Sequence, residues 1–138
     1  MTLLQLYELA DQYGIEIDCL PMRETKSLAL PQGLIALDPY HTESANEMKV
    51  CLAHEMGHIE TSSFYNIHSS LDIRKKHETR ADKWAIQQLI REDDLDDAVS
   101  KGHTEIWDLA DYFGVTEEFM EKTVCLYTYG NLATDLYF

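Results

Sequence analysis

The sequence predicts an α+β fold in which helices predominate and a small three-stranded antiparallel sheet packs near the long helix that follows it. Three observations lead to this fold class. Apolar residues recur with a helical period through most of the chain. Short apolar runs bounded by turn residues occur only within residues 15–37. A length of 138 residues is enough for one domain with a sizeable core.

We expect a single domain over residues 1–138, organised in three consecutive parts. Residues 1–72 should hold an N-terminal helix, the sheet and the long helix. Residues 73–130 should hold the remaining helices, since their apolar residues keep a helical period. Residues 131–138 form an apolar tail without a clear period.

The first elements follow from local patterns. An apolar stripe that includes Leu3 and Leu6 predicts a helix over residues 2–13, which Gly14 ends. Alternating apolar residues predict a strand over residues 15–20. Two further apolar runs flank a Pro-Gln-Gly turn signal and read as antiparallel strands. These strands are Ser27–Leu30 and Gly33–Leu37, and the later helices are expected at residues 73–90, 93–100, 104–113 and 116–127.

Composition limits the partners. With 25 acidic and 11 basic residues the net charge is −14, which argues against nucleic acid or an anionic membrane as a direct partner. No apolar run approaches membrane-spanning length, and the first residues lack the basic region of a signal peptide. Cys19, Cys51 and Cys125 are odd in number and scattered, which is typical of reduced thiols in the cytoplasm.

The motif HEMGH, from His54 to His58, is the strongest chemical signal in the chain. Histidines four residues apart on a helix share one face and can bind one metal ion. Glu55 lies beside the first histidine, where its carboxylate can act as a general base on a metal-bound water. This is the HExxH signature of zinc hydrolases. Thr42 or Ser44 can cap the helix, and with Ser44 as cap Glu47 takes the capping-box position.

Gly57 stands inside this predicted helix, where glycine costs about 1 kcal/mol of helix propensity relative to alanine. One reason to place glycine there is the close approach of another backbone next to the metal.

A third ligand must come from elsewhere in the chain. The extended motif HExxHxxGxxH fails, because Thr61 and Phe64 occupy its glycine and histidine positions. Glu78 and Asp82 are four residues apart on the next predicted helix, so one can bind the metal and the other can accept the N–H of a ligand histidine. We predict His54, His58 and Glu78 as ligands and Asp82 as the partner, with His77 as the rival third ligand.

The paired motifs resemble the ImmA/IrrE family of small metallopeptidases. AHEMGH at residues 53–58 is similar to that family's AHExGH, and Glu78, Ala81 and Asp82 match its ExxAD. The likeness extends over about residues 10–128. It implies a zincin-like fold with a gluzincin-like HExxH…E site, and a Zn²⁺ peptidase that cuts a DNA-binding repressor and so switches on a mobile genetic element or a stress response.

Two further regions have alternative interpretations. Tyr65 and His68 follow the motif and are candidate donors to the transition-state oxyanion. Residues 106–127 resemble a helix-turn-helix, but the second helix would present Glu117, Glu118 and Glu121 to DNA phosphates. A packing role or a surface for a protein partner is therefore favoured over DNA binding.

The sequence thus predicts a cytoplasmic zinc endopeptidase with Glu55 as general base. The family resemblance implies that it cleaves a regulatory protein, a helix-turn-helix repressor. The strand before the metal helix, residues 33–37, is expected to offer an edge to which an extended peptide can add. The alternative is a regulator without proteolytic activity that binds metal and acts by binding the repressor. Retention of Glu55 favours the enzyme, because metal binding alone does not require it.

Overall fold

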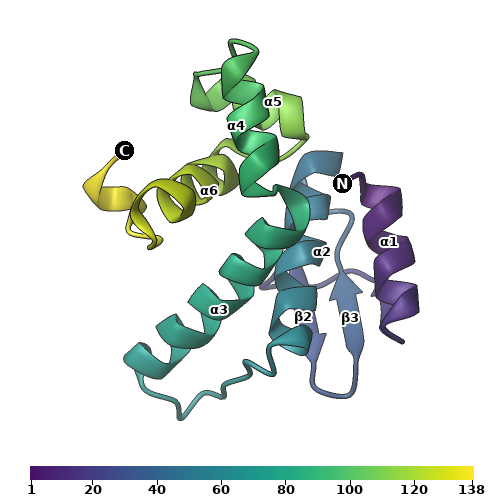
Figure 1. Ribbon diagram of the computed structural model, residues 1–138. Coiled ribbons are helices and arrows are strands. Elements are labelled where there is room, and N and C mark those ends of the chain that lie inside the picture. The colour runs from purple at the N-terminus through teal and green to yellow at the C-terminus, as the bar shows by residue number, and fades with distance from the viewer.

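The computed structural model describes all 138 residues and is built from six α-helices and three short strands (Figure 1). It confirms the α+β class with helices predominating. The predicted elements are all present and differ from prediction mainly at their ends. The elements are α1 (Leu3–Gln12), β1 (Glu16–Cys19), β2 (Ser27–Leu30), β3 (Leu34–Leu37), α2 (Ala45–Glu60), α3 (Leu71–Leu89), α4 (Glu92–Ser100), α5 (Ile106–Phe113), α6 (Glu117–Tyr129) and a 3-10 turn (Thr134–Leu136).

The sheet is mixed, so the prediction of a purely antiparallel sheet is wrong in one pairing. Its strand order is β1-β3-β2. The hairpin β2–β3 is antiparallel as predicted, but β1 pairs with β3 in parallel. The reason is that β3, which carries the fully buried Ile35 and Leu37, takes the central position. The connection from β1 to β2 passes the end of β3, where the Met22 backbone N–H donates to the Asp38 carboxylate at 2.8 Å.

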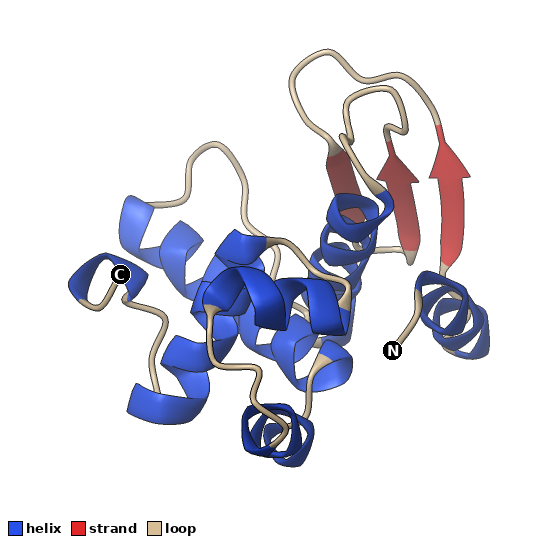
Figure 2. Ribbon diagram, turned by 90° about the horizontal axis from the view of Figure 1, so that it is seen from above, coloured by secondary structure: helices blue, strands red, loops and turns tan.

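Helix α2 lies between the sheet and the other helices. Figure 2 shows the strands on one side of the molecule and α3 to α6 on the other. Leu52 and Met56 of α2 are fully buried, and they join Ile35 and Leu37 of the sheet and Ile86 of α3 in one apolar core. The HEMGH motif therefore lies on a helix that packs against both the sheet and α3, where side-chain positions are set by packing.

The start of α2 differs in one detail from prediction. Ser44, rather than Thr42, caps the helix, and its hydroxyl accepts the Glu47 backbone N–H at 3.1 Å. A reciprocal capping box does not form. The Glu47 carboxylate instead accepts the N–H of Glu43 and pairs with Lys26 of the β1–β2 connection. The Glu47 side chain thus pairs with a residue far along the chain, Lys26, and not with the backbone N–H of Ser44 as a capping box requires.

Lys49 of α2 is a buried cation at the junction of three segments. Only 6% of the residue is exposed. Its ammonium group donates to the carbonyl of Met1 at 3.1 Å and to the carbonyl of Phe113, the last residue of α5, at 2.8 Å. A cation at a helix C-terminus is favourable, but burial lowers the pKa of Lys49. The residue thus connects α1, α2 and α5.

Helices α5 and α6 form the turn that resembles a helix-turn-helix. Gly114 ends α5 in the left-handed region, with a φ of 65°, and Thr116 caps α6 through the Phe119 N–H. Val115, Phe119 and Met120 point into the core. No helix in the structure has the length and apolar character required to cross a bilayer.

Candidate metal centre

The centre is built where helices α2 and α3 cross. A Cβ atom placed on Gly57 would lie 2.5 Å from the carbonyl oxygen of Ala81 and 2.9 Å from its Cα atom. The two backbones are therefore in direct contact, as the glycine in the motif suggested. His54 and His58 stand three residues before and one residue after Gly57, and Glu78 and Asp82 stand in the same relation to Ala81. One close contact thus brings two pairs of polar side chains face to face.

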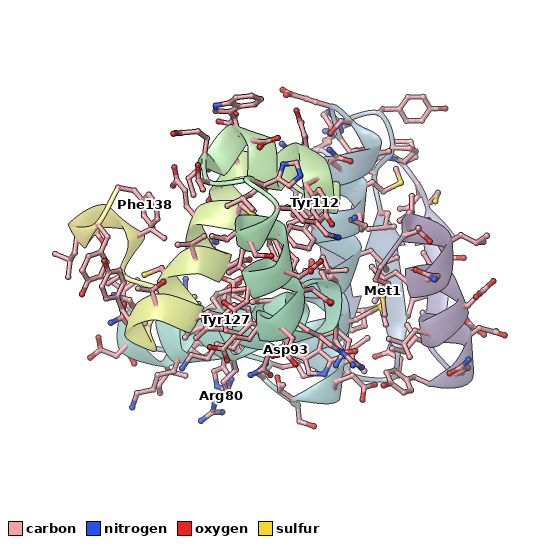
Figure 3. All side chains as sticks on the ribbon, turned by 45° about the horizontal axis from the view of Figure 1, so that its top comes forward. Met1, Arg80, Asp93, Tyr112, Tyr127 and Phe138 are labelled. Carbon is pink, nitrogen blue, oxygen red and sulfur yellow. The ribbon has the colours of Figure 1, made fainter.

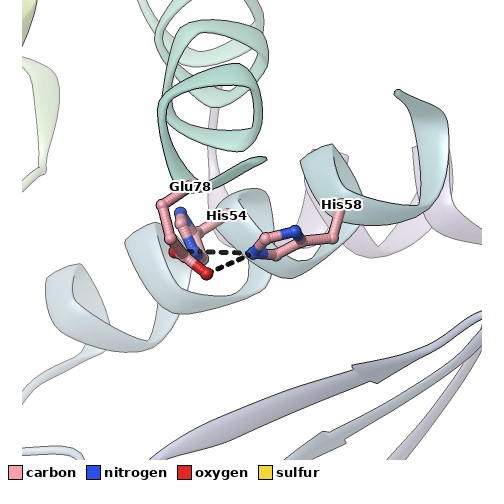
Figure 4. Close-up of side chains that lie close together, drawn as sticks. All are labelled: His54, His58 and Glu78. Atoms are coloured by element: carbon pink, nitrogen blue, oxygen red, sulfur yellow. Dashed lines mark hydrogen bonds and ion pairs between the residues drawn. The ribbon is translucent and has the colours of Figure 1, made fainter. Parts of the chain in front are cut away.

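Three of these side chains converge on one point (Figure 4). The Nε2 atoms of His54 and His58 are 3.1 Å apart. The carboxylate of Glu78 reaches His54 Nε2 at 2.7 Å and His58 Nε2 at 3.1 Å. One ligand atom from each residue lies within 4.8 Å of the others. Two imidazoles and one carboxylate, with room for a water, are the ligand set of a catalytic metal site.

The hydrogen bonds on the far side of each ring fix the histidine tautomers. His54 Nδ1 donates to Asp82 Oδ1 at 2.7 Å, and His58 Nδ1 donates to the carbonyl of Ser63 at 2.6 Å. Carbonyl and ionised carboxylate oxygens only accept, so both Nδ1 atoms carry the proton. Both Nε2 lone pairs then face each other and the Glu78 oxygens. Such an arrangement is stable only with positive charge between the groups, so the residues fit a metal cation.

The pKa values express the same preference for positive charge. Burial on its own would lower the pKa of His54, but hydrogen bonds to Asp82 and Glu78 raise it to about 10. The pKa of His58 is raised in the same way by Glu78 and the Ser63 carbonyl, against the effect of burial. Burial would raise the pKa of Glu78, yet its bonds to both histidines and to Tyr65 hold that pKa well below the ordinary value.

Asp82 is held from a second side by the C-terminal helix. Lys122 of α6 lies 3.2 Å from its Oδ2 atom, while Oδ1 accepts the His54 N–H. Burial raises the pKa of Asp82, but the hydrogen bond with His54 and the charge of Lys122 outweigh this and lower it. Asp82 therefore stays ionised and orients His54.

A cleft of about 400 Å³ opens in front of the three side chains. The Glu55 carboxylate reaches this cleft although only 7% of the residue is exposed. It accepts a hydrogen bond from the Ser27 hydroxyl of β2 at 2.7 Å. Ser27, Leu28 and Ala29 of β2 line the opposite wall. Because β3 is central, the strand edge beside the cleft belongs to β2, and the predicted edge at residues 33–37 is wrong.

The comparison with protein families identifies the family of this chain. The family model Peptidase_M78, described as the IrrE N-terminal-like domain, matches residues 10–124. The chain belongs to this family. Its peptidase character agrees with the HExxH helix, the buried Glu55 and the acidic third residue from α3.

A solved structure described as a Mycobacterium tuberculosis transcriptional regulator has the same fold as this Peptidase_M78 chain. The superposition covers 89% of the chain, with a TM-score of 0.68 and 18% sequence identity. The chain spans only 40% of that protein. At this identity the likeness concerns the fold alone. No curated protein sequence matches the chain.

The other residues singled out in this Peptidase_M78 sequence are placed differently by the structure. The Tyr65 hydroxyl donates to Glu78 Oε1 at 2.8 Å, so it lies at the cleft. His68 is exposed and does not line the cleft. His77 is not part of the three-residue group, and its Nδ1 atom is buried without a hydrogen-bond partner. Adjacent helical residues point about 100° apart, so α3 can direct only one of His77 and Glu78 to the ion.

Three contacts escaped the sequence analysis of this family member. Ser27 binds the carboxylate of Glu55, the Ser63 carbonyl orients His58, and Lys122 pairs with Asp82. Ser27 and Lys122 lie far along the chain from their partners, and a backbone carbonyl has no sequence signature. No spacing rule could have linked them to the motif.

Proposed function

We propose that the protein is a zinc-dependent endopeptidase that cleaves a regulatory protein in the cytoplasm, namely a DNA-binding repressor. The observation that carries the proposal is the buried Glu55 carboxylate in the cleft beside His54, His58 and Glu78. Metal binding alone has no use for this carboxylate, whereas peptide hydrolysis needs a general base. Membership of Peptidase_M78 supports the same activity.

In this proposal His54, His58 and Glu78 hold the ion. The roles of the other residues in the cleft follow from the hydrogen bonds that they make. Zinc bound there would polarise the scissile carbonyl and lower the pKa of its water to about 7. Glu55 would be the base that accepts the proton of the attacking water and passes it to the leaving nitrogen. Asp82 and the Ser63 carbonyl keep the two imidazoles in the tautomer that presents Nε2.

The cleft also suggests how a substrate is held. Strand β2 pairs only with β3, so its other edge is free beside the cleft. An extended peptide that adds to this edge is bound through its backbone, which favours loops or unfolded segments over particular side chains. Tyr65 stands close enough to serve as an oxyanion donor, while the corresponding role of His68 has no contact to support it.

Replacement of Glu55 by glutamine tests the proposal. Glu55→Gln keeps an oxygen that can accept from Ser27 but removes the base, so cleavage of a DNA-binding repressor that the parent protein cuts should slow about 10²–10⁴-fold. Zinc content and repressor binding should not change. Glu60→Gln, on the exposed end of the same helix, is the matched control and should cleave normally.

The same variant decides between the two classes of function. If Glu55→Gln relieves repression as well as the parent protein does, the protein acts by binding the repressor. The peptidase proposal would then be abandoned in favour of a regulator without proteolytic activity.

A further inference from the structure

Helix α3 carries a cluster of unpaired positive charge on the side away from the metal centre. Lys75, Lys76, Arg80 and Lys83, the basic face, line a shallow hollow of about 460 Å³ together with Thr79 and a single carboxylate, that of Asp72. They account for four of the 11 lysines and arginines in a chain with 25 acids. None of the four lies within 4 Å of a carboxylate, whereas Lys26, Lys101 and Lys122 each do.

Such clustering is unfavourable for the helix itself. Lys76 and Arg80 are four residues apart, where like charges repel one another. An ordinary solvated helix surface alternates opposite charges at this spacing, and this chain has acids in excess to supply them. The basic face is therefore suited to an anionic partner.

The complementary surface is present in the same chain. Helix α4 exposes five carboxylates within six residues, and only Asp97 has a basic partner, Lys101, in an exposed pair. No ion pair joins α4 to the basic face within one molecule. In Figure 1 α4 continues upward from the end of α3, and in Figure 3 the labelled Arg80 and Asp93 lie towards the same edge. The carboxylates are Glu92, Asp93, Asp94, Asp96 and Asp97.

We propose that two copies of this chain associate through these surfaces, with the basic face of each α3 against α4 of the other. A two-fold axis produces this contact twice, because an interface of that symmetry pairs surface i with surface j and j with i. A long polyanion such as DNA fits less well, since α4 directly follows α3 and repels it. A second copy satisfies both surfaces at once.

The association should be weak and sensitive to salt. One helix pair on each side of the axis buries less than the ~1,200 Å² typical of stable complexes. The net charge of −14 on each copy also opposes contact. At about 0.1 M salt the distant charges are screened over roughly 10 Å while facing pairs still attract, and at about 1 M the attraction is largely lost too. This inference does not depend on the peptidase proposal.

Sedimentation equilibrium of the full chain at high micromolar concentration tests it. The parent protein should show a monomer–dimer equilibrium at the lower salt concentration and monomer at the higher. Arg80→Glu with Lys83→Glu should be monomeric in both, as should Asp93→Lys with Asp96→Lys. Glu8→Lys with Asp11→Lys, on the exposed side of α1, changes net charge in the same sense as the α4 variant and should still dimerise.

Mixing the two reversed variants gives the decisive result. Each presents surfaces that complement the other, so their 1:1 mixture should form a heterodimer, and a chain with all four substitutions should dimerise again. A parent protein that stays monomeric, or a mixture that stays monomeric, overturns the inference. A salt-sensitive shift of a DNA duplex that is lost in the Arg80/Lys83 variant would also overturn it, by assigning the basic face to nucleic acid.

Discussion

Two pairs of packed helices in this molecule differ in what lies between them. In the pair α2–α3 the backbones touch at Gly57 and Ala81, and buried or half-buried polar groups face one another. In the pair α5–α6 the interface is apolar, with Val115, Phe119 and Met120 in the core. The charged residues of α6 lie largely outside, and both Glu117 and Glu118 are exposed.

The difference shows that a pair of packed helices can either bring polar side chains together, as α2 and α3 do, or form part of the apolar core, as α5 and α6 do. A close backbone contact lets short side chains such as Glu78 and Asp82 reach across to the histidines. An apolar interface with a glycine turn instead positions the helices and leaves the polar groups in water. Substitutions between α2 and α3 should therefore alter metal binding, whereas substitutions in the apolar interface between α5 and α6 should alter stability only.

The largest expected difference concerns the third ligand. Glu78→Ala should reduce metal content from one ion per chain to nearly zero, because two histidines from one helix leave the coordination incomplete. His77→Ala should keep the ion, since His77 is outside the converging group. Elemental analysis of both variants, before and after addition of zinc, measures this. The reverse result would exchange the roles of the two residues.

Glycine-to-alanine substitutions compare the two helix pairs directly. Gly57→Ala places a methyl group 2.5 Å from the Ala81 carbonyl oxygen, and we expect a loss of about 1–3 kcal/mol of unfolding free energy together with weaker metal binding. Gly114→Ala puts a side chain at a φ of 65° and should cost about 1 kcal/mol with metal binding intact. Urea titrations and metal titrations of both variants provide the measurement. Equal metal affinity in the two variants would show that the close contact between α2 and α3 does not determine the positions of the metal-binding side chains.

A smaller effect is expected from the partner of His54. Asp82→Asn keeps an oxygen that can accept from Nδ1 but removes the negative charge, so metal affinity should fall about 10–100-fold. Glu118→Gln on α6 is the control, because its side chain is 82% exposed and also lies beside Lys122. Competition with a chelator gives both affinities. An Asp82→Asn affinity within twofold of the parent would exclude the assigned role.

The last prediction is that the protein does not bind DNA. The acidic surface of α6 and the net charge of −14 predict no binding to DNA at physiological salt. A gel shift with random duplex should show free DNA throughout a titration to micromolar protein. A retarded band that disappears as salt rises, and that persists in the Arg80→Glu/Lys83→Glu variant, would restore the helix-turn-helix interpretation of α5–α6.

Local patterns were enough to predict most elements, and the spacing within each motif was enough to select His54, His58 and Glu78, which the structure brings together. This worked because four-residue spacing and helical geometry are linked. Their roles as metal ligands stay predictions. The parallel pairing of β1 with β3 could not be read in the same way, because strand order depends on which strand the core buries most deeply.

The groups that support the site were beyond the reach of the sequence for a related reason. Ser27 acts on Glu55 from the sheet, and Lys122 acts on Asp82 across 40 positions of the chain. Neither residue type is rare, and neither stands at a recognisable distance from its partner. Their roles depend on the crossing of α2 and α3 and on where α6 docks.

Lys49 has a consequence for how the chain folds. Its ammonium group binds carbonyls that lie 48 residues before it and 64 residues after it. Until both segments arrive, the charge has no reason to leave water, since a cation buried without partners is strongly unfavourable. Closing these two long loops costs entropy that local helix formation does not. Helix α2 should therefore complete its packing late, in one cooperative step with α1 and α5, so that the N-terminal and C-terminal parts unfold in a single transition.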